Sequence, residues 1–195
     1  MNFLAHALLA GGEAALVVGG VAGDWIKGSL PGALPFDLAR GVALHRAMDS
    51  HAESSAPFKA SRQRISAQRR RYSGVLVDIF FDHLLAKNWA ALQPTPLTHF
   101  SAAVYRMISA RVHELPASAL FALQLMARED WLANYARLEF IAEVLARMSG
   151  RARQPNPLAG AEQEFLRDPS GFDADFRLWL AEAMAFSGRW RNRSD

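Results

Sequence analysis

The fold class of this chain is indicated by the stretch Val75-Leu76-Val77-Asp78-Ile79-Phe80-Phe81-Asp82-His83-Leu84-Leu85. Its first residues, Val75 to Ile79, have the β-branched, apolar composition of a buried strand. Asp78 and Asp82, however, are four residues apart, which puts their side chains on one face of a helix. Helix-forming residues then continue to Leu92. The stretch therefore predicts a helix that is apolar around most of its surface and carries two carboxylates.

Helical periodicity also dominates the rest of the 195 residues, and no Asn-Gly or Asp-Gly hairpin turn lies between alternating segments. We therefore expect an all-α fold, a single-domain helical bundle over residues 1–195 with a C-terminal helical extension from about residue 156. Glycines at 19, 20 and 23 interrupt an apolar helix and predict close helix packing or a local break, because each costs a helix about 1 kcal/mol. The expected helices span residues 2–10, 13–27, 36–50, 56–66, 70–92, 97–114, 117–128, 130–149, 158–167 and 173–187.

Composition limits the class of protein. Hydrophobic residues make up 51% of the chain and charged residues 21%, which is typical of a folded globular protein. No uncharged run approaches the roughly 18 residues of a membrane-spanning helix, and the first ten residues lack the basic start of a signal peptide. The chain has no cysteine, which excludes disulfides and thiolate ligands. We therefore expect a cytoplasmic protein with no membrane span.

Basic residues are concentrated in one interval of the chain. No acidic residue lies between Glu53 and Asp78, and the cations in that interval are Lys59, Arg62, Arg64, Arg69, Arg70 and Arg71. Such a block favours an anionic partner: nucleic acid, a membrane surface or an acidic protein. A solvated helix face is the alternative. Nucleic acid is disfavoured, because aromatic residues do not alternate with the basic ones in a base-stacking pattern.

A second signal is a set of polar residues placed in apolar helices. His45 and Asp49 are four residues apart, as are Asp78 and Asp82. Carboxylates in apolar surroundings need a positive partner, either arginine or a divalent metal. A single histidine in an apolar helix is more often a core residue than a metal ligand. Imidazoles and carboxylates without thiolate suit Mn²⁺, Mg²⁺, Fe²⁺ or Zn²⁺. The residues of this kind are His6, Asp24, His45, Asp49, Asp78, Asp82 and His83.

Four blocks of the chain together resemble one protein family. The blocks are Met1-Asn2-Phe3-Leu4-Ala5-His6, Val21-Ala22-Gly23-Asp24-Trp25-Ile26-Lys27-Gly28, Gly41-Val42-Ala43-Leu44-His45-Arg46-Ala47-Met48-Asp49 and Arg70-Arg71-Tyr72-Ser73-Gly74-Val75-Leu76-Val77-Asp78-Ile79-Phe80-Phe81-Asp82-His83-Leu84-Leu85-Ala86. Their order and spacing are similar to those of the acyl carrier protein phosphodiesterases, an all-helical family related to the HD-type metal-dependent phosphohydrolases. The resemblance therefore implies an HD-like helical bundle.

The resemblance also implies an activity and a site. It implies a hydrolase dependent on Mn²⁺, with Mg²⁺ or Fe²⁺ as alternatives, that releases 4′-phosphopantetheine from holo acyl carrier protein. The matching blocks give as expected metal ligands Asp24, His45, Asp49, Asp78, Asp82 and His83. The expected catalytic residues are His6, Asp24 and His83. Because acyl carrier proteins are acidic, the residues expected to bind the carrier are Arg69, Arg70 and Arg71.

One departure from the family pattern follows the block that ends at Asp49. The family usually has a Phe-Thr-Asp run there, whereas this chain has His51-Ala52-Glu53. Two other functions stay open at this point. One is a phosphohydrolase of nucleotides or another small phosphodiester on the same scaffold, and the other is a non-enzymatic helical module that binds an acidic protein.

Overall fold

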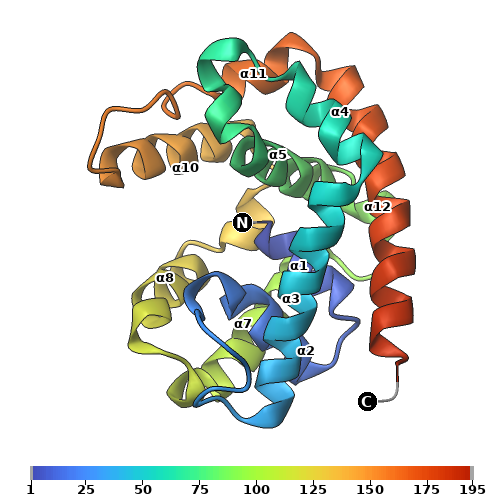
Figure 1. The fold of residues 1–195 in the computed structure, drawn as a ribbon, viewed down its shortest axis with the longest axis vertical. Helices are drawn as coiled ribbons and strands as arrows, with labels where there is room; N and C mark the ends of the chain where they lie inside the picture. The colour runs from blue at the N-terminus through green and yellow to red at the C-terminus, as the bar shows by residue number, and fades with distance from the viewer. Residues whose placement is uncertain (1, 194–195) are drawn as a thin grey trace.

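The computed structural model describes residues 2–193, and every regular element within that range is helical (Figure 1). The expected all-α fold is confirmed. The α-helices are α1 (Phe3–Leu9), α2 (Ala14–Ala22), α3 (Phe36–Ser54), α4 (Ala56–Arg64), α5 (Ser73–Lys87), α6 (Trp89–Leu92), α7 (Leu97–Ala110), α8 (Ala117–Arg128), α9 (Trp131–Asn134), α10 (Leu138–Arg151), α11 (Glu162–Arg167) and α12 (Pro169–Arg191). Shorter 3₁₀ turns lie at Gly23–Trp25, Ala67–Tyr72 and Val112–Glu114.

Two of the expected helices are each divided into two α-helices, and the α-helices expected at 13–27 and 97–114 end at Ala22 and Ala110, before the 3₁₀ turns. The segment expected at 70–92 consists of the end of a 3₁₀ turn, then α5 and α6, because Asn88 ends α5 and its side chain donates a hydrogen bond to the carbonyl of Leu84 (2.9 Å). The segment expected at 130–149 consists of α9 and α10, since Arg137 adopts an extended backbone conformation between them. These breaks follow from local backbone geometry that hydrophobic periodicity does not reveal.

The last helix, α12, is longer than the expected 173–187. The side chain of Asp168 accepts a hydrogen bond from the backbone N–H of Gly171 (3.0 Å) and caps the helix. Pro169 occupies the first helical position, where the missing N–H costs nothing. In Figure 1, α12 runs along one side of the molecule, where it packs against α3 and α4.

The tightest packing in the described chain is the crossing of α2 with α3. A Cβ atom added to Gly41 would lie 2.5 Å from the carbonyl oxygen of Ala15, and one added to Gly19 would lie 2.6 Å from that of Leu38. Both distances are shorter than atoms can approach, so the two backbones touch where these residues have no side chain. The close packing expected from the glycines of α2 is confirmed.

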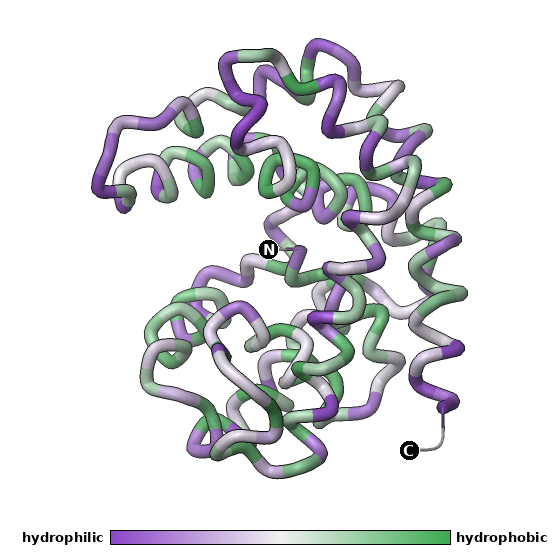
Figure 2. Tube along the Cα trace, viewed as in Figure 1, coloured by the Kyte–Doolittle hydropathy of each residue, from purple (hydrophilic) through white to green (hydrophobic). Residues whose placement is uncertain are grey.

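Helix α1 lies at the centre of the molecule, between α2 and α5 (Figure 1). Its residues from Phe3 to Ala7 are all buried, and so are most of those of α2 and α5. Figure 2 shows hydrophobic residues along these inner helices and a largely hydrophilic connection between α10 and α11. Among residues 2–193, no helix combines the length and the apolarity needed to cross a bilayer.

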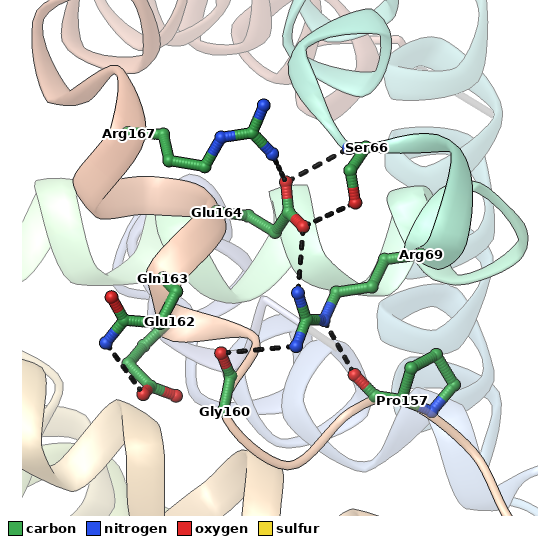
Figure 3. A network of polar contacts seen from close by, with 8 residues as sticks. All are labelled: Ser66, Arg69, Pro157, Gly160, Glu162, Gln163, Glu164 and Arg167. Carbon is green, nitrogen blue, oxygen red and sulfur yellow. Dashed lines mark hydrogen bonds and ion pairs between the residues drawn. The ribbon is translucent and has the colours of Figure 1, made fainter.

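A buried carboxylate joins the basic segment of the chain to α11. Glu164 is 2% exposed and accepts hydrogen bonds from the backbone N–H (3.0 Å) and the hydroxyl (2.6 Å) of Ser66. It also accepts from Arg69 and from Arg167, both at 3.0 Å (Figure 3). This network holds the turn Ala67–Tyr72 in place against the C-terminal part of the chain.

The crossing of α2 and α3 yields a stability prediction. We expect Gly41→Ala to lower the free energy of unfolding by about 3 kcal/mol, because the added methyl group meets backbone rather than a movable side chain. The control is Gly188→Ala in α12, where an added Cβ has no heavy atom within 4 Å. This second change should be neutral or stabilising by up to about 1 kcal/mol. Urea unfolding of both variants tests the idea, and equal stability of the two would contradict it.

Candidate metal centre

His6 of α1 meets His45 and Asp49, which lie one turn apart on α3. Nε2 of His6 lies 3.2 Å from Oδ1 of Asp49, and Nε2 of His45 lies 3.2 Å from Oδ2 of the same carboxylate. The two imidazole rings stack with their centroids 4.1 Å apart. Among the described residues, one ligand atom from each of the three lies within 4.8 Å of the others, close enough to share an ion. Both histidines are buried, whereas the Asp49 side chain is 47% exposed and faces solvent.

The end of α2 fixes the orientation of His45. Nδ1 of His45 donates a hydrogen bond to the carbonyl oxygen of Gly20 (2.8 Å), so this nitrogen carries the hydrogen. In the neutral ring, Nε2 therefore carries a lone pair and acts as a hydrogen-bond acceptor. The ionised carboxylate of Asp49 that it faces is an acceptor too. Two acceptors at 3.2 Å repel each other unless a proton or a metal cation lies between them. The arrangement thus favours a bound cation.

Gly23, at which the sequence predicts close helix packing or a local break, also shapes the centre. A Cβ atom on Gly23 would lie 2.4 Å from the ring of His45. The lack of a side chain at this position therefore lets the imidazole lie directly against the turn that follows α2. The signal in the sequence was a glycine directly before Asp24, but its partner was not visible there.

Two more carboxylates lie near the three residues. Oδ1 of Asp24, in the turn after α2, is 3.7 Å from Nε2 of His45. Asp78 extends from α5, where burial raises its pKa and the negative charges of Asp49 and Asp24 raise it further. Carboxylates that raise one another's pKa create a negative potential, which attracts a cation. The structure therefore places Asp24 beside the centre, and Asp78 near enough for the charges there to act on its pKa.

The structure does not bring Asp82 into this group. Its two carboxylate oxygens accept hydrogen bonds from the backbone N–H groups of Leu4 and Ala5, each at 2.9 Å. These N–H groups belong to the first turn of α1, which has no carbonyl partner for them within the helix. Asp82 is fully buried, and burial raises its pKa to about 8 despite the two hydrogen bonds. It anchors the helix that carries His6.

His83 also points away from the centre. Its Nδ1 donates a hydrogen bond to the carbonyl oxygen of Tyr135 (2.8 Å), and its ring packs edge-to-face against Phe165. The side chain is buried, and burial lowers its pKa. These contacts join α5 to α9 and α11.

The three consecutive arginines of the basic segment differ in their surroundings. Arg69 donates hydrogen bonds to Glu164 (3.0 Å), to the carbonyl of Pro157 (2.8 Å) and to that of Gly160 (3.5 Å) (Figure 3). Arg70 and Arg71 are exposed. The structure therefore leaves Arg70 and Arg71, but not Arg69, available to a partner.

Burial and the contacts of Asp49 with the imidazoles determine whether His6 and Asp49 carry a proton. Burial lowers the pKa of His6 to about 4, although the hydrogen bond with Asp49 opposes this change. Burial alone would raise the pKa of Asp49, but the two imidazoles hold it well below its usual range. At neutral pH the centre thus contains a neutral His6 and an ionised carboxylate, both able to ligate a cation.

This pKa predicts how acid affects the metal-free protein. The unfolded chain binds a proton at His6 near pH 6.5, whereas the folded chain binds it near pH 4. Stability should therefore fall as the pH drops from 7 to 4, by about 3 kcal/mol from this residue. We expect the free energy of unfolding of the chelator-treated wild type to fall by this much more than that of His6→Gln. Parallel pH profiles for the two proteins would contradict the assignment.

Comparison with known proteins identifies a family. A family model described as acyl carrier protein phosphodiesterase matches residues 1–183. A protein of that name from Pectobacterium atrosepticum is 34% identical over 165 residues, covering 84% of this chain and 86% of the relative. Another from Yersinia pestis is 33% identical over 162 residues, covering 83% and 84%. A third from Photorhabdus laumondii is 31% identical over 177 residues, covering 90% and 89%.

No solved structure matches the chain, so the expected similarity to HD-type folds stays a prediction. The family match, in contrast, extends over all the residues of the candidate centre. Since the matched region and the relatives both span most of the sequence, this chain belongs to the acyl carrier protein phosphodiesterase family.

Proposed function

We propose that this protein hydrolyses the phosphodiester between 4′-phosphopantetheine and a serine of holo acyl carrier protein. The family supports the substrate and the reaction type. The observation that carries the proposal is the convergence of His6, His45 and Asp49 on one point beside α1, with acceptor atoms facing one another. Such a site favours a bound cation, and phosphodiester hydrolysis is a reaction that a bound divalent cation accelerates.

The residues of the centre fit a divalent metal. Two imidazole nitrogens and a carboxylate oxygen form a mixed donor set that suits Mn²⁺ or Fe²⁺, and the added carboxylates of Asp24 and Asp78 would also suit Mg²⁺. We propose Mn²⁺ as the ion, held by His6, His45 and Asp49. When bound, it would lower the pKa of a water molecule and stabilise negative charge on the phosphoryl oxygens.

The chain's own residues contribute orientation and proton control. The hydrogen bond to the carbonyl of Gly20 keeps Nε2 of His45 directed at the centre. His6, with a pKa of about 4, offers its lone pair at neutral pH without first losing a proton. Asp78, whose pKa is raised by burial, is the residue best suited to accept a proton from an attacking water. Asp82 and His83 act indirectly, by holding α1 and α5.

Activity is tested most directly on the carrier protein itself. We expect holo acyl carrier protein incubated with this protein and Mn²⁺ to lose the mass of 4′-phosphopantetheine, and to keep it when a chelator is added. His45→Ala should abolish the loss, whereas His99→Ala, at an exposed position on α7, should not. Mass spectrometry of the carrier gives the result. An unchanged carrier mass with the wild-type protein and Mn²⁺ would refute the proposed reaction.

Two aspartate variants distinguish a proposed metal ligand from a residue that only holds α1 in place. Mn²⁺ at 100 times its dissociation constant should stabilise the wild type by about 2.7 kcal/mol. Asp49→Ala should lose most of this gain. Asp82→Ala should keep it but be less stable than wild type by about 1–3 kcal/mol with and without the ion, because two buried N–H groups of α1 lose their acceptor. Chemical unfolding in chelator and in Mn²⁺ measures both effects, and a lost Mn²⁺ response in Asp82→Ala alone would reverse the assignment.

A further inference from the structure

A basic pocket lies between the end of α4 and the start of α5. It has a volume of about 260 Å³ and is lined by Lys59, Arg62, Gln63, Arg70 and Ser73. Three of these residues are cations, and one of the three, Arg62, pairs with the carboxylate of Glu53. The pocket also opens at the N-terminal turn of α5, where the helix dipole favours an anion.

Two other cations of the basic segment hold the fold together instead of lining the pocket. Arg69 is bound to Glu164, and Arg64 is bound to Asp168 and Asp175, so these two cations are neutralised by acids from the C-terminal helices. Lys59 donates to a backbone carbonyl, and Arg70 is exposed. Within residues 2–193, no ion pair joins either of them to a carboxylate.

Two helices lead from this pocket to the candidate metal centre. Ser73 precedes Asp78 by five residues on α5, which corresponds to about 7.5 Å along the helix axis. Glu53, the partner of Arg62, follows Asp49 by four residues on α3, or about 6 Å. The two helices are adjacent here, since a Cβ atom on Gly74 would lie 3.6 Å from Oε1 of Glu53. The pocket is therefore one to two helical turns from the centre.

We propose that the pocket of Lys59, Arg62 and Arg70 binds a carboxylate side chain of the acyl carrier protein that lies within about two turns of its modified serine. This inference rests on the proposed function. The prosthetic group is joined through a single phosphate, and that phosphate must be at the metal centre to react. A separate anion site several ångströms away therefore fits the protein part of the substrate, and side-chain carboxylates are the anions that an acidic protein offers. Guanidinium groups bind carboxylates in fork-like pairs, which gives the contact direction as well as charge.

Within the basic segment, the residue that holds the fold differs from the residues proposed to bind the carrier. Arg69 is a structural residue, whereas Arg70, its neighbour in sequence, binds the substrate. Charges at the rim of an interface act mainly on encounter and affinity, and salt screens them. Loss of a pocket cation should therefore raise KM and leave kcat unchanged.

The first test measures KM for holo carrier at low salt. We expect Lys59→Ala and Arg70→Ala each to raise KM about fivefold with little change in kcat. This difference should shrink at about 0.5 M salt, where charges are screened over about 4 Å. The control is Arg106→Ala, which removes an exposed arginine from α7 and should leave KM unchanged. An unchanged KM in the pocket variants, or an equal rise in Arg106→Ala, overturns the proposal.

A binding measurement separates this proposal from the proposed reaction. Fluorescence anisotropy with labelled apo carrier needs neither metal nor hydrolysis. Weaker binding by Arg70→Ala than by wild type supports the docking site even if the carrier is never cleaved. Equal binding by the two proteins overturns it even if cleavage occurs.

A charge exchange tests the kind of partner group. Arg70→Glu should bind the carrier more weakly than Arg70→Ala. Replacing one carboxylate near the modified serine of the carrier by lysine should then recover at least threefold of the lost affinity for Arg70→Glu and weaken binding to the wild type. If no carboxylate in that part of the carrier gives this recovery, the pocket does not bind the carrier in the proposed way.

Discussion

The backbone contact between α2 and α3 is the constraint on which the candidate centre depends. Gly19 and Gly41 let the two helices touch without intervening side chains. This contact brings the carbonyl of Gly20 within 2.8 Å of His45 and the turn containing Asp24 beside the same ring. A larger separation of the helices would break that hydrogen bond and release the imidazole to rotate. The packing of α2 against α3 therefore also sets the orientation of the His45 imidazole.

The third residue of the centre, His6, arrives on a helix of only seven residues, which has little stability of its own. Its first turn is held by Asp82, a buried carboxylate of α5 that accepts two backbone N–H groups. Asp82 is therefore a fully buried carboxylate that anchors a helix, whereas Asp24 and Asp49, at the candidate centre, are partly exposed. The two N–H groups of α1 satisfy the buried carboxyl of Asp82, as a buried polar group requires.

The basic segment is divided in a similar way. Acidic side chains of α11 and α12 neutralise Arg64 and Arg69, whereas Lys59 and Arg70 remain at a pocket beside α5. The departure from the family pattern at residues 51–53 lies between these regions. There, His51 stacks on Phe186 of α12, and Glu53 pairs with Arg62. Glu53 thus links the end of α3 to the pocket rather than to the centre.

The sequence predicted the helical class and the shared helix face of His45 and Asp49, because these depend on spacing within one helix. For the glycines at 19, 20 and 23 it left close packing and a local break open. It also marked the polar residues of the core as unusual. The folded chain was needed to show that His6 joins His45 and Asp49, that Asp82 and His83 contact backbone groups, and that Arg69 faces inward. The physical reason is that helical spacing tells which side chains share a face, whereas the partner of that face comes from residues distant in the chain. Whether a buried polar side chain supports the fold or joins the centre therefore depends on the group that it contacts.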